Sequence, residues 1–509
     1  MVSRGARTNA IKRLHEWLSI SKFLPIQRVD PACATSTHLQ SCDPATCQPL
    51  VQFKETCNGD LDKIIEEASR AQKAWCMQPP LERAKILHKL AELIRSESEW
   101  LAELETLDTG KPLWESLNDI NACADVVTMF AGFLPTLNGT HSPVPPNPAS
   151  FYYTRREPFG VCAGIGAWNF PFQMAVWKSA PAVAAGNAFI FKPSPLTPLT
   201  AVRLTELYTK AGCPNCLFSV VLGGSNVGQA LINNPNISKV SFTGSVVGGK
   251  SVLSSSAHRI VPATIELGGN SALIIMPDSD LDEAVKGALM ANYFTQGQVC
   301  SNANRVFVHK SIAKAFQEKL IPAVRNIRVG DPFDPATSMG ALISPEHTKK
   351  VQGYIHSAIS EGGMVLIGGT QPTFPPDCEL DPTNFLTPCV VANCHDDMLA
   401  VKEEIFGPVM TLLEFQDEEE VIQRANNSPF GLAGGVFTRD LRTAHRIAAE
   451  LQCGTVYVNT YNAYPPGIPF GGYKQSGYGR ENSLDTLLSY TQLKSIYVEG
   501  GSLPNPFPT

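Results

Sequence analysis

The sequence has no long hydrophobic run, no excess of basic charge and no repeated or low-complexity segment. Its longest apolar stretch, SAPAVAAGNAFIF between Lys178 and Lys192, is too short for the ~20 residues that a membrane helix needs. The formal net charge of −6 gives no electrostatic footprint for nucleic acid. We therefore expect no membrane partner and no nucleic-acid partner. What remains is a chain of 509 residues, 43% hydrophobic and 17% charged, which is typical of a globular protein.

The cysteines also lack a pattern. All 14 are scattered along the chain instead of being spaced as a disulfide framework, which favours a reducing compartment, and we expect the cytoplasm. The pair Cys213-Pro-Asn-Cys216 has no second CxxC and no histidine pair at ligand spacing, so it indicates a loop and no metal site. Residues 1–24 are basic and poor in acid, as in a transit peptide, which leaves the mitochondrial matrix as an alternative. A basic N-terminal helix fits the same residues.

The length exceeds one ordinary hydrophobic core, so we expect two or three domains. Helical periodicity covers residues 61–107, interrupted at Pro79-Pro80, and residues 114–133. After Pro158, short apolar strands alternate with helices, and the alternation restarts after Glu266. This order predicts two doubly wound α/β domains with a cleft between them. The expected strands are 160–165, 188–192, 218–222 and 239–242 in the first half, and 272–275, 306–309, 364–367, 389–392 and 411–415 in the second.

The remaining segments are less regular. Residues 28–58 are rich in Pro, Thr, Ser and Cys and predict an irregular lead-in, and residues 135–157 predict an excursion that leaves the domain body and returns. Residues 487–498 alternate well enough to predict a strand added to a partner's sheet. The expected division is an N-terminal extension (1–44), a first domain (45–134 and 158–265), a second domain (266–465), an arm (135–157 and 485–500) and a segment returning to the first domain and the cleft (466–484).

Two motifs of the first half point to a nucleotide. In the string from Val240 to Gly249, a strand is followed by a glycine turn and a helix, whose N-terminal amides suit a phosphate. This string departs from the GxGxxG fingerprint, and an ordinary helix entry fits it too. Lys192 ends another strand, where ligands bind in such sheets, and is placed to reach ribose hydroxyls. A solvent-facing lysine is the alternative, but the two motifs together favour a nucleotide.

Three further residues indicate covalent catalysis. Cys300 lies in the polar, glycine-containing string from Gln296 to Ser301, and Glu266 precedes two glycines. A thiol and a distant carboxylate suit nucleophilic attack followed by proton transfer or water activation. Asn169, between a strand and a helix, is placed to stabilise an oxyanion or to cap the helix before Pro171. Most free cysteines are small buried core residues, so the case for Cys300 depends on the rest of the chain.

Seven strings, in this order along the chain, resemble motifs of the aldehyde dehydrogenase superfamily over residues 45–495: WNFP from Trp168, KPS from Lys192, FTGS from Phe242, ELGG from Glu266, QVC ending at Cys300, EEIFGP from Glu403 and PFGGYK from Pro469. Longer strings, among them YTRREPFGVCAGIGAWNFPFQ and VKGALMANYFTQGQVC, resemble the 4-trimethylaminobutyraldehyde and betaine aldehyde dehydrogenase branch. The resemblance implies a Rossmann-like NAD-binding domain, a catalytic domain and a small β oligomerisation arm.

The resemblance also implies roles for single residues. Cys300 is then the nucleophile that forms a thiohemiacetal and, after hydride transfer, a thioester; Asn169 and the Cys300 amide form the oxyanion hole, Glu266 activates water, and Glu481 assists a proton relay. The implied cofactor-binding residues are Trp168, Lys192, Ser194, Gly244, Ser245, Gly249, Leu267, Glu404 and Phe406. Interception of the thioester by coenzyme A is an alternative outcome, against which a water-activating Glu266 argues.

Two positions depart from the family pattern. Asn270 replaces the lysine of the usual ELGGK, and we expect altered local packing or charge but intact catalysis. Many strictly NAD-using members carry a glutamate three residues after the ribose lysine, where it repels a 2′-phosphate, and here Pro195 stands in that place. NAD is the expected cofactor, and NADP is not excluded.

The family's substrate tunnel corresponds to the aromatic residues Phe170, Trp177, Phe294 and Tyr464, with Tyr293, Tyr461 and Phe470 as further candidates. Aromatic faces bind quaternary ammonium groups by cation–π attraction, which suits a trimethylamino-aldehyde. A greasy tunnel for aliphatic or aromatic aldehydes uses the same residue types. The loop of residues 460–468, TYNAYPPGI, is this chain's own and is a place where selectivity can differ. The family norm is a homotetramer, which we expect here.

Overall fold

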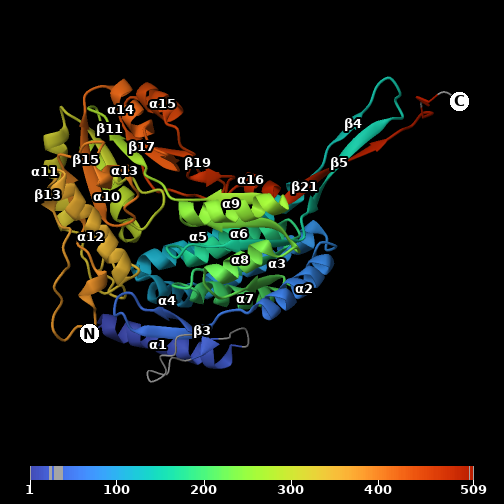
Figure 1. Ribbon diagram of the computed structural model, residues 1–509, viewed down its shortest axis with the longest axis horizontal. Coiled ribbons are helices and arrows are strands. Elements are labelled where there is room, and N and C mark those ends of the chain that lie inside the picture. The colour runs from blue at the N-terminus through green and yellow to red at the C-terminus, as the bar shows by residue number, and fades with distance from the viewer. Residues whose placement is uncertain (1, 22–25, 28–37, 504, 508–509) are drawn as a thin grey trace.

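The computed structural model describes residues 2–21, 26–27, 38–503 and 505–507. Two parallel sheets with helices on their faces form the body, and a narrow antiparallel arm projects from it (Figure 1). This arrangement confirms the expected α/β fold class, with two doubly wound sheets and a projecting arm. No described helix is long and apolar enough to cross a membrane.

The first sheet has the strand order β20-β10-β9-β6-β7-β8. All its pairings are parallel except that of β20 with β10. Its strands are β6 (Val161–Ile165), β7 (Ala188–Lys192), β8 (Phe218–Val220), β9 (Ile237–Thr243), β10 (Ala263–Glu266) and β20 (Gly477–Tyr478). Every residue of β7 is buried, as expected for a continuous apolar run in a central parallel strand.

The direction of winding reverses between β6 and β9. From β6 the chain proceeds through β7 to β8 on one side, whereas β9 and β10 lie on the other. In an open parallel sheet, ligands bind in the crevice beyond the carboxyl ends of the strands at such a switch point. The helices of this half are α2 (Asn58–Trp75), α3 (Pro80–Ser96), α4 (Ser98–Thr109), α5 (Leu113–Phe133), α6 (Pro171–Ala184), α7 (Leu199–Ala211), α8 (Ser225–Asn233) and α9 (Val246–Arg259).

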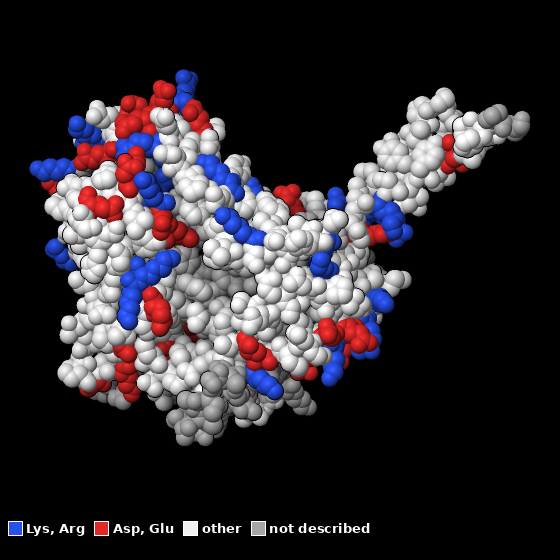
Figure 2. Space-filling model, viewed as in Figure 1, with Lys and Arg blue, Asp and Glu red and all other residues white. Residues whose placement is uncertain are grey.

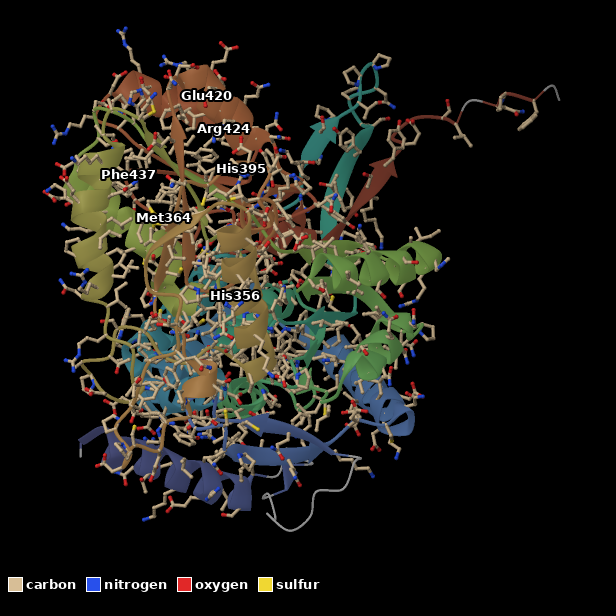
Figure 3. All side chains as sticks on the ribbon, turned by 60° about the vertical axis from the view of Figure 1, so that its left-hand side comes forward. His356, Met364, His395, Glu420, Arg424 and Phe437 are labelled. Carbon is tan, nitrogen blue, oxygen red and sulfur yellow. The ribbon has the colours of Figure 1, made fainter. Side chains whose placement is uncertain are left out.

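The second sheet has the order β13-β14-β15-β12-β11-β17-β18, with only β13 antiparallel to its neighbour. Its strands are β11 (Ala272–Ile275), β12 (Arg305–His309), β13 (Met364–Ile367), β14 (Cys389–Ala392), β15 (Val409–Phe415), β17 (Ala433–Phe437) and β18 (Thr455–Val458). Its helices are α10 (Leu281–Tyr293), α11 (Ala313–Arg325), α12 (Pro345–Ser360), α13 (Leu399–Lys402), α14 (Glu418–Asn426) and α15 (Leu441–Glu450). On α14, Arg424 pairs with Glu420 and with Asp396, which ties this helix to the segment after β14 (Figure 3).

Small elements complete the chain. Three 3-10 turns span Leu134–Thr136, Phe294–Gly297 and Pro382–Asn384, and β16 (Phe430–Gly431) pairs with β19 (Tyr473–Lys474). The arm is the sheet β21-β5-β4, made of β4 (His141–Pro143), β5 (Phe151–Pro158) and β21 (Thr491–Val498), and α16 (Leu484–Ser489) precedes β21. The division of the chain into domains at the expected boundaries stays a prediction.

Three sequence-based expectations are wrong in part. Residues 487–498 are not one strand: α16 continues to Ser489, and β21 begins at Thr491 and pairs with β5 of the same chain over its whole length. The lead-in is not irregular where it is described, because β2 (His38–Cys42) and β3 (Pro49–Lys54) form a sheet with β1 (Ile26–Gln27). Val51 and Phe53 alternate into the core of this sheet. Residues 28–37 lie outside the described part. Residues 61–107 form three helices, since the chain breaks again at Glu97.

The N-terminal segment forms the helix α1 (Val2–Ile20), which packs beside β3 at the base of the first sheet (Figure 1). Ala10, Leu14 and Trp17 are buried in a cluster with Trp100 and Phe53. The Trp17 indole also donates a hydrogen bond of 3.0 Å to Glu206. Buried Arg7 forms ion pairs with Asp43 and Asp331, which joins α1 to two separate segments. These contacts support the interpretation of residues 2–20 as a basic N-terminal helix that belongs to the fold.

Replacing Trp17 by alanine is expected to destabilise the protein by about 3–5 kcal/mol, because the change empties a core site and removes a buried hydrogen bond. Thermal unfolding at a fixed scan rate measures the effect. The Lys12→Ala variant, on the exposed side of the same helix, is the matched control. If both variants unfolded at the wild-type temperature, α1 would not be packed against the core.

Candidate active site

A cavity of about 230 Å³ lies at the switch point of the first sheet and reaches the second. It begins where β6 and β9 end, at Trp168–Asn169 and Thr243–Ser245. Residues of the second half close it, including Cys300, Glu404 and Phe406. Eight of the residues expected from the sequence to act in catalysis or cofactor binding line this one cavity: Trp168, Asn169, Gly244, Ser245, Leu267, Cys300, Glu404 and Phe406.

Backbone contacts fix the position of Cys300. The preceding turn has left-handed backbone at Thr295 (φ 49°) and Gln296 (φ 57°). Buried Glu115 holds this turn by accepting hydrogen bonds of 3.3 Å from both the amide and the hydroxyl of Thr295. On the other side, a Cβ atom on Gly269 would lie 2.4 Å from the Cys300 carbonyl oxygen. The chain can approach Cys300 this closely only because residue 269 has no side chain.

The Cys300 thiol is half-buried and faces the cavity. Exclusion of water raises its pKa, and the negative charges of Glu404 and Glu266 raise it further. The thiol is therefore protonated at neutral pH in this state, and attack needs a base or a nearby positive charge. Asn169, 3% exposed, donates a 2.8 Å hydrogen bond from Nδ2 to the Gln298 carbonyl, which places its amide beside the Cys300 loop.

Glu266 lies at the end of β10, 3% exposed, and neither carboxylate oxygen has a hydrogen-bond partner among the described residues. Burial raises its pKa well above the usual range, and the charge of Glu481 adds to this, whereas Lys178 and Arg480 oppose it. An unpartnered buried carboxyl group of raised pKa suits proton transfer near neutral pH. Glu266 does not line the cavity itself but influences the pKa of the thiol that does.

Glu481 is held by a residue that the sequence did not reveal. The Lys178 ammonium, fully buried on α6, donates a 2.5 Å hydrogen bond to Glu481 and a 3.1 Å bond to the Ser241 hydroxyl. The two charges satisfy each other inside the protein, where either alone would be costly. Together they form the charged surroundings of Glu266.

Glu404 is bound to the turn that follows Glu266. Its Oε1 accepts a 2.9 Å hydrogen bond from the Gly269 amide, and burial raises its pKa to about 7. Asn270 donates from Nδ2 to the carbonyls of Val401 and Lys402, at 2.8 and 3.0 Å. The neutral amide thus anchors the segment leading to Glu404, in agreement with an effect on local packing.

An aromatic wall stands beside Glu404. Trp168 packs edge-on against Phe406 at 5.2 Å and against His347 at 5.3 Å, and His347 hydrogen-bonds to the Phe406 carbonyl at 2.7 Å. His347 and Lys350, both from α12, line the cavity and were not expected from the sequence. No motif marked them, because the helix that carries them lies more than a hundred residues from Trp168 and Thr243.

The other expected cofactor residues lie outside the cavity lining. Lys192 lies at the end of β7 and is 5% exposed. Its ammonium group donates a hydrogen bond to the carbonyl of Pro193, and burial lowers its pKa to about 8. Ser194 accepts a 3.2 Å bond from the Leu196 amide. Gly249 lies under Leu267, where a Cβ atom would approach Leu267 Cδ2 to 2.5 Å. Gly249 thus permits close packing of α9.

The expected substrate residues form three groups. Trp177 packs on Phe470 at 5.9 Å, and Phe470 packs on Tyr464 at 5.2 Å. Phe294 lies 6.4 Å from Trp114. The ring of Phe170 faces the Lys111 ammonium at 4.2 Å.

Tyr293 and Tyr461, the two further candidates for the substrate tunnel, lie in different surroundings. Tyr293 is a core residue, since its hydroxyl donates to the Cys389 carbonyl inside the second half. Tyr461 instead donates to the Ser301 carbonyl at 2.9 Å, next to Cys300. In the loop of residues 460–468, the hydroxyl of Tyr464 also contacts that of Ser301.

A buried charged cluster lies behind Phe170 and was also missed from the sequence. Lys111 is fully buried and bonds Asp119 at 2.8 Å and Glu105 at 3.4 Å. Burial raises the pKa of Glu105 to about 7 and that of Glu115 to about 8, and the charge of Lys111 opposes both shifts. The cluster links α4 and α5 to the turn that carries Cys300.

The described cysteines outside the cavity form no disulfide bond. All described cysteines are free thiols, and no group of three or more metal-binding side chains occurs among the described residues. Cys213 is buried, whereas Cys216 has left-handed backbone (φ 64°) and bonds Glu67 at 3.2 Å. These contacts agree with the interpretation of this pair as a loop.

A thiol on the wall of a crevice at the switch point of a parallel sheet, with a buried carboxyl group that influences its pKa, suits an oxidoreductase that binds a dinucleotide. The chain belongs to the aldehyde dehydrogenase family, whose model matches residues 32–496. It is 51% identical over 465 residues to 4-trimethylaminobutyraldehyde dehydrogenase of Oryzias latipes, covering 91% of this chain and 92% of that protein. The protein is therefore an enzyme that oxidises aldehydes with a nicotinamide dinucleotide.

Solved structures agree. A betaine aldehyde dehydrogenase from Staphylococcus aureus, in complex with NAD⁺, superposes with a TM-score of 0.92 at 36% identity and covers 99% of this chain and 100% of that chain. An NADP-dependent enzyme from E. coli superposes with a TM-score of 0.87 at 35% identity, covering 91% and 94%. Because both cofactors occur on this fold, the fold alone does not choose between them.

The residues present fit a dinucleotide. The amides at the start of α9 open to the cavity after Gly244, and a Cβ atom there would lie 2.7 Å from the Phe242 ring, so the turn admits only glycine without a shift. Lys192, at the end of β7, and Glu404, in the loop after α13, are buried polar groups with few hydrogen-bond partners among the described residues.

The Gly269→Ala variant is expected to displace Cys300, because the new Cβ atom would meet its carbonyl oxygen and backbone cannot yield as a flexible side chain does. A shift of about 1 Å would lower the rate of aldehyde oxidation by about 100-fold. NADH formation and the alkylation rate of the Cys300 thiol report the change. Gly353→Ala, where nothing lies within 4 Å, is the control, and equal activity of the two variants would contradict the contact.

Proposed function

We propose that the protein is an NAD-dependent aldehyde dehydrogenase in which Cys300 is the nucleophile and Glu266 the base that releases the acid. The observation that carries this proposal is the placement of Cys300 and Asn169 on the wall of the same cavity as the α9 N-terminus and Glu404. The bound cofactor supplies the acceptor for hydride. The remaining steps fall to side chains of this chain.

In the first step the Cys300 sulfur adds to the aldehyde carbon, and negative charge develops on the aldehyde oxygen. The Asn169 side-chain amide and the Cys300 backbone amide donate hydrogen bonds to that oxygen. Because burial keeps the thiol protonated, its proton must pass to solvent before the attack. Loss of hydride from the thiohemiacetal leaves a thioester on Cys300.

In the second step water attacks the thioester. Glu266 takes the proton of that water, and release of the acid restores the thiol. The charges of the Lys178–Glu481 pair influence the pKa of Glu266, and this pair would receive the proton from Glu266 and pass it onward. With a dinucleotide bound, Glu404, which lines the cavity together with Cys300, would hold the nicotinamide ribose, and Lys192, outside that lining, would hold the adenosine ribose. Gly244 and Ser245 would hold the pyrophosphate, Phe406 would pack by the nicotinamide ribose, and Trp168 and Leu267 would flank the cofactor. Ser194 and Gly249 support these positions from outside the cavity.

The Cys300→Ala variant should give no NADH, because no adduct forms. The Glu266→Gln variant should give one rapid burst of NADH per site and then turn over about 10²–10⁴-fold more slowly than wild type, since only hydrolysis loses its base. Stopped-flow absorbance with NAD⁺ and an aldehyde separates the two phases. A burst missing from Glu266→Gln would contradict a role confined to hydrolysis, and turnover that required coenzyme A would contradict the hydrolytic outcome.

The proposed substrate is an aldehyde with a terminal trimethylammonium group, such as 4-trimethylaminobutyraldehyde or betaine aldehyde. The relative that is 51% identical bears the name of the first, and the solved relative from Staphylococcus aureus that of the second. In this chain Trp177, Phe470 and Tyr464 pack edge to face in a row, and the Tyr464 hydroxyl contacts that of Ser301, next to Cys300. Phe170 is less suited to bind the cation on its inner face, which Lys111 already covers.

Replacing Trp177 by leucine should lower kcat/KM for 4-trimethylaminobutyraldehyde about 2–30-fold more than for hexanal, the effect of losing one cation–π contact of about 0.5–2 kcal/mol. Trp177→Phe keeps an aromatic face and should retain most of the preference. Steady-state NADH formation with both aldehydes measures the ratio. A wild-type enzyme that prefers hexanal would overturn the trimethylammonium assignment in favour of a broad aliphatic aldehyde dehydrogenase.

We also propose a homotetramer in the cytoplasm. The arm projects from the body and carries few charges on the face in view, whereas acidic and basic residues mix over the body (Figure 2). Tyr152, Leu493 and Tyr497 are exposed on its strands. Projecting strands with exposed large side chains and free edges suit pairing with another copy of the chain. The packing of α1 into the core supports the cytoplasm over a compartment that requires a removable leader.

A further inference from the structure

Glu55 is a carboxylate that lies outside every family motif. Glu55 follows β3, and its Oε1 accepts a 2.6 Å hydrogen bond from the Gly224 amide, just before α8 begins at Ser225. Cβ atoms built on Gly223 and Gly224 would lie only 3.3 and 3.2 Å from this oxygen. Two glycines thus let the backbone close on the carboxylate. The hydrogen bonds among the described residues engage only Oε1.

Glu55 shares its surroundings with Lys192. The Lys192 side chain lies along the first turn of α8, because a Cβ atom on Gly228 would be 3.4 Å from its Cδ. Burial lowers the pKa of Lys192, and the nearby charge of Glu55 opposes that shift. Within the described residues, the ammonium group bonds only the carbonyl of Pro193, at 2.9 Å. An acceptor and a donor therefore flank the place proposed above for the adenosine ribose.

We propose that Glu55 makes this enzyme select NAD over NADP. This inference rests on the proposed function, which places the ribose at Lys192. A carboxylate at this point accepts a hydrogen bond from a ribose hydroxyl and repels a 2′-phosphate. It does so from a different segment of the chain than the position after the ribose lysine, where Pro195 carries no charge.

The N-terminus of α8 lies beside Glu55. A helix N-terminus attracts anions through its free amides and its dipole, so an empty one beside the ribose would attract a 2′-phosphate. Here the Glu55 carboxylate already accepts the Gly224 amide. A phosphate with a charge of about −1.5 to −2 would have to displace that carboxylate or lie against it. Lys192 is the one opposing cation that these contacts place there, and Glu55 balances its charge.

Glu55→Gln is the sharpest variant, because its amide oxygen can still accept the Gly224 bond while the charge is lost. NADP⁺ should bind about tenfold more tightly to this variant than to wild type, and NAD⁺ should change less than about threefold. Glu55→Arg, which adds a phosphate-binding group, should gain about 100-fold for NADP⁺. Glu66→Gln removes the same charge from an exposed site on α2 and should change neither cofactor.

Isothermal titration calorimetry of each full-length variant with NAD⁺ and NADP⁺ measures binding directly, and the ratio of kcat/KM for the two cofactors checks it during turnover. An unchanged NADP⁺ to NAD⁺ ratio in Glu55→Gln, with an unaltered unfolding temperature, would overturn the inference. So would a wild-type protein that binds both equally well. If wild type bound neither cofactor, the proposed function itself would fail, which is a distinct result.

Discussion

The close approach of the turn Gly268–Gly269 to the second half of the molecule constrains the entire site. A Cβ atom on Gly268 would lie 2.1 Å from Glu404 Oε2, and one on Gly269 would lie 2.4 Å from the Cys300 carbonyl oxygen. The Gly269 amide meanwhile donates to Glu404. A single turn thus sets the distance between the strand that ends in Glu266 and the loop that carries the thiol. The Glu266 carboxyl group, the Cys300 thiol and Glu404 keep their relative positions because this turn has no side chains.

Burial then determines the chemistry of these groups. Exclusion of water raises the pKa values of both Cys300 and Glu266, so the resting site avoids two adjacent negative charges. The buried Lys178–Glu481 pair brings balanced charge to the same region. A second buried cluster, Lys111 with Glu105 and Asp119, lies behind Phe170, and the neighbouring Glu115 accepts a hydrogen bond from Thr295 in the turn before Cys300. Both charged networks are satisfied internally, as buried charges must be if they are not to destabilise the fold.

The sequence predicts single strands and short motifs, but it does not reveal contacts between residues far apart along the chain. Strand β7 was predicted because its apolar run is continuous, and Cys300, Asn169 and Glu404 because each lies in a short distinctive string that ends at the same crevice. Lys178 and Glu481 are 303 residues apart, and Glu55 and Gly224 are 169 apart, so no local pattern joins them. Tyr293 was misplaced because an aromatic residue near a catalytic string is as often core as pocket, and its partner, the Cys389 carbonyl, becomes visible only in the fold. Residues 487–489, the end of α16, were predicted as strand because they continue the alternation of β21.

Cofactor choice depends on residues around the turn Gly268–Gly269 and not on the fold. Enzymes that use NAD⁺ and NADP⁺ share its fold, so the choice of cofactor must reside in a few side chains at the rim of the first sheet. On the other side of Cys300, Ser301 contacts Tyr461 and Tyr464 of the loop of residues 460–468. At Asn270, where the family motif has a lysine, the neutral amide donates hydrogen bonds to two carbonyls of the segment before Glu404. The segment is thus held without a charge at this position. Specificity therefore varies at positions that surround the turn Gly268–Gly269, because a side chain at the turn itself would separate the reacting groups.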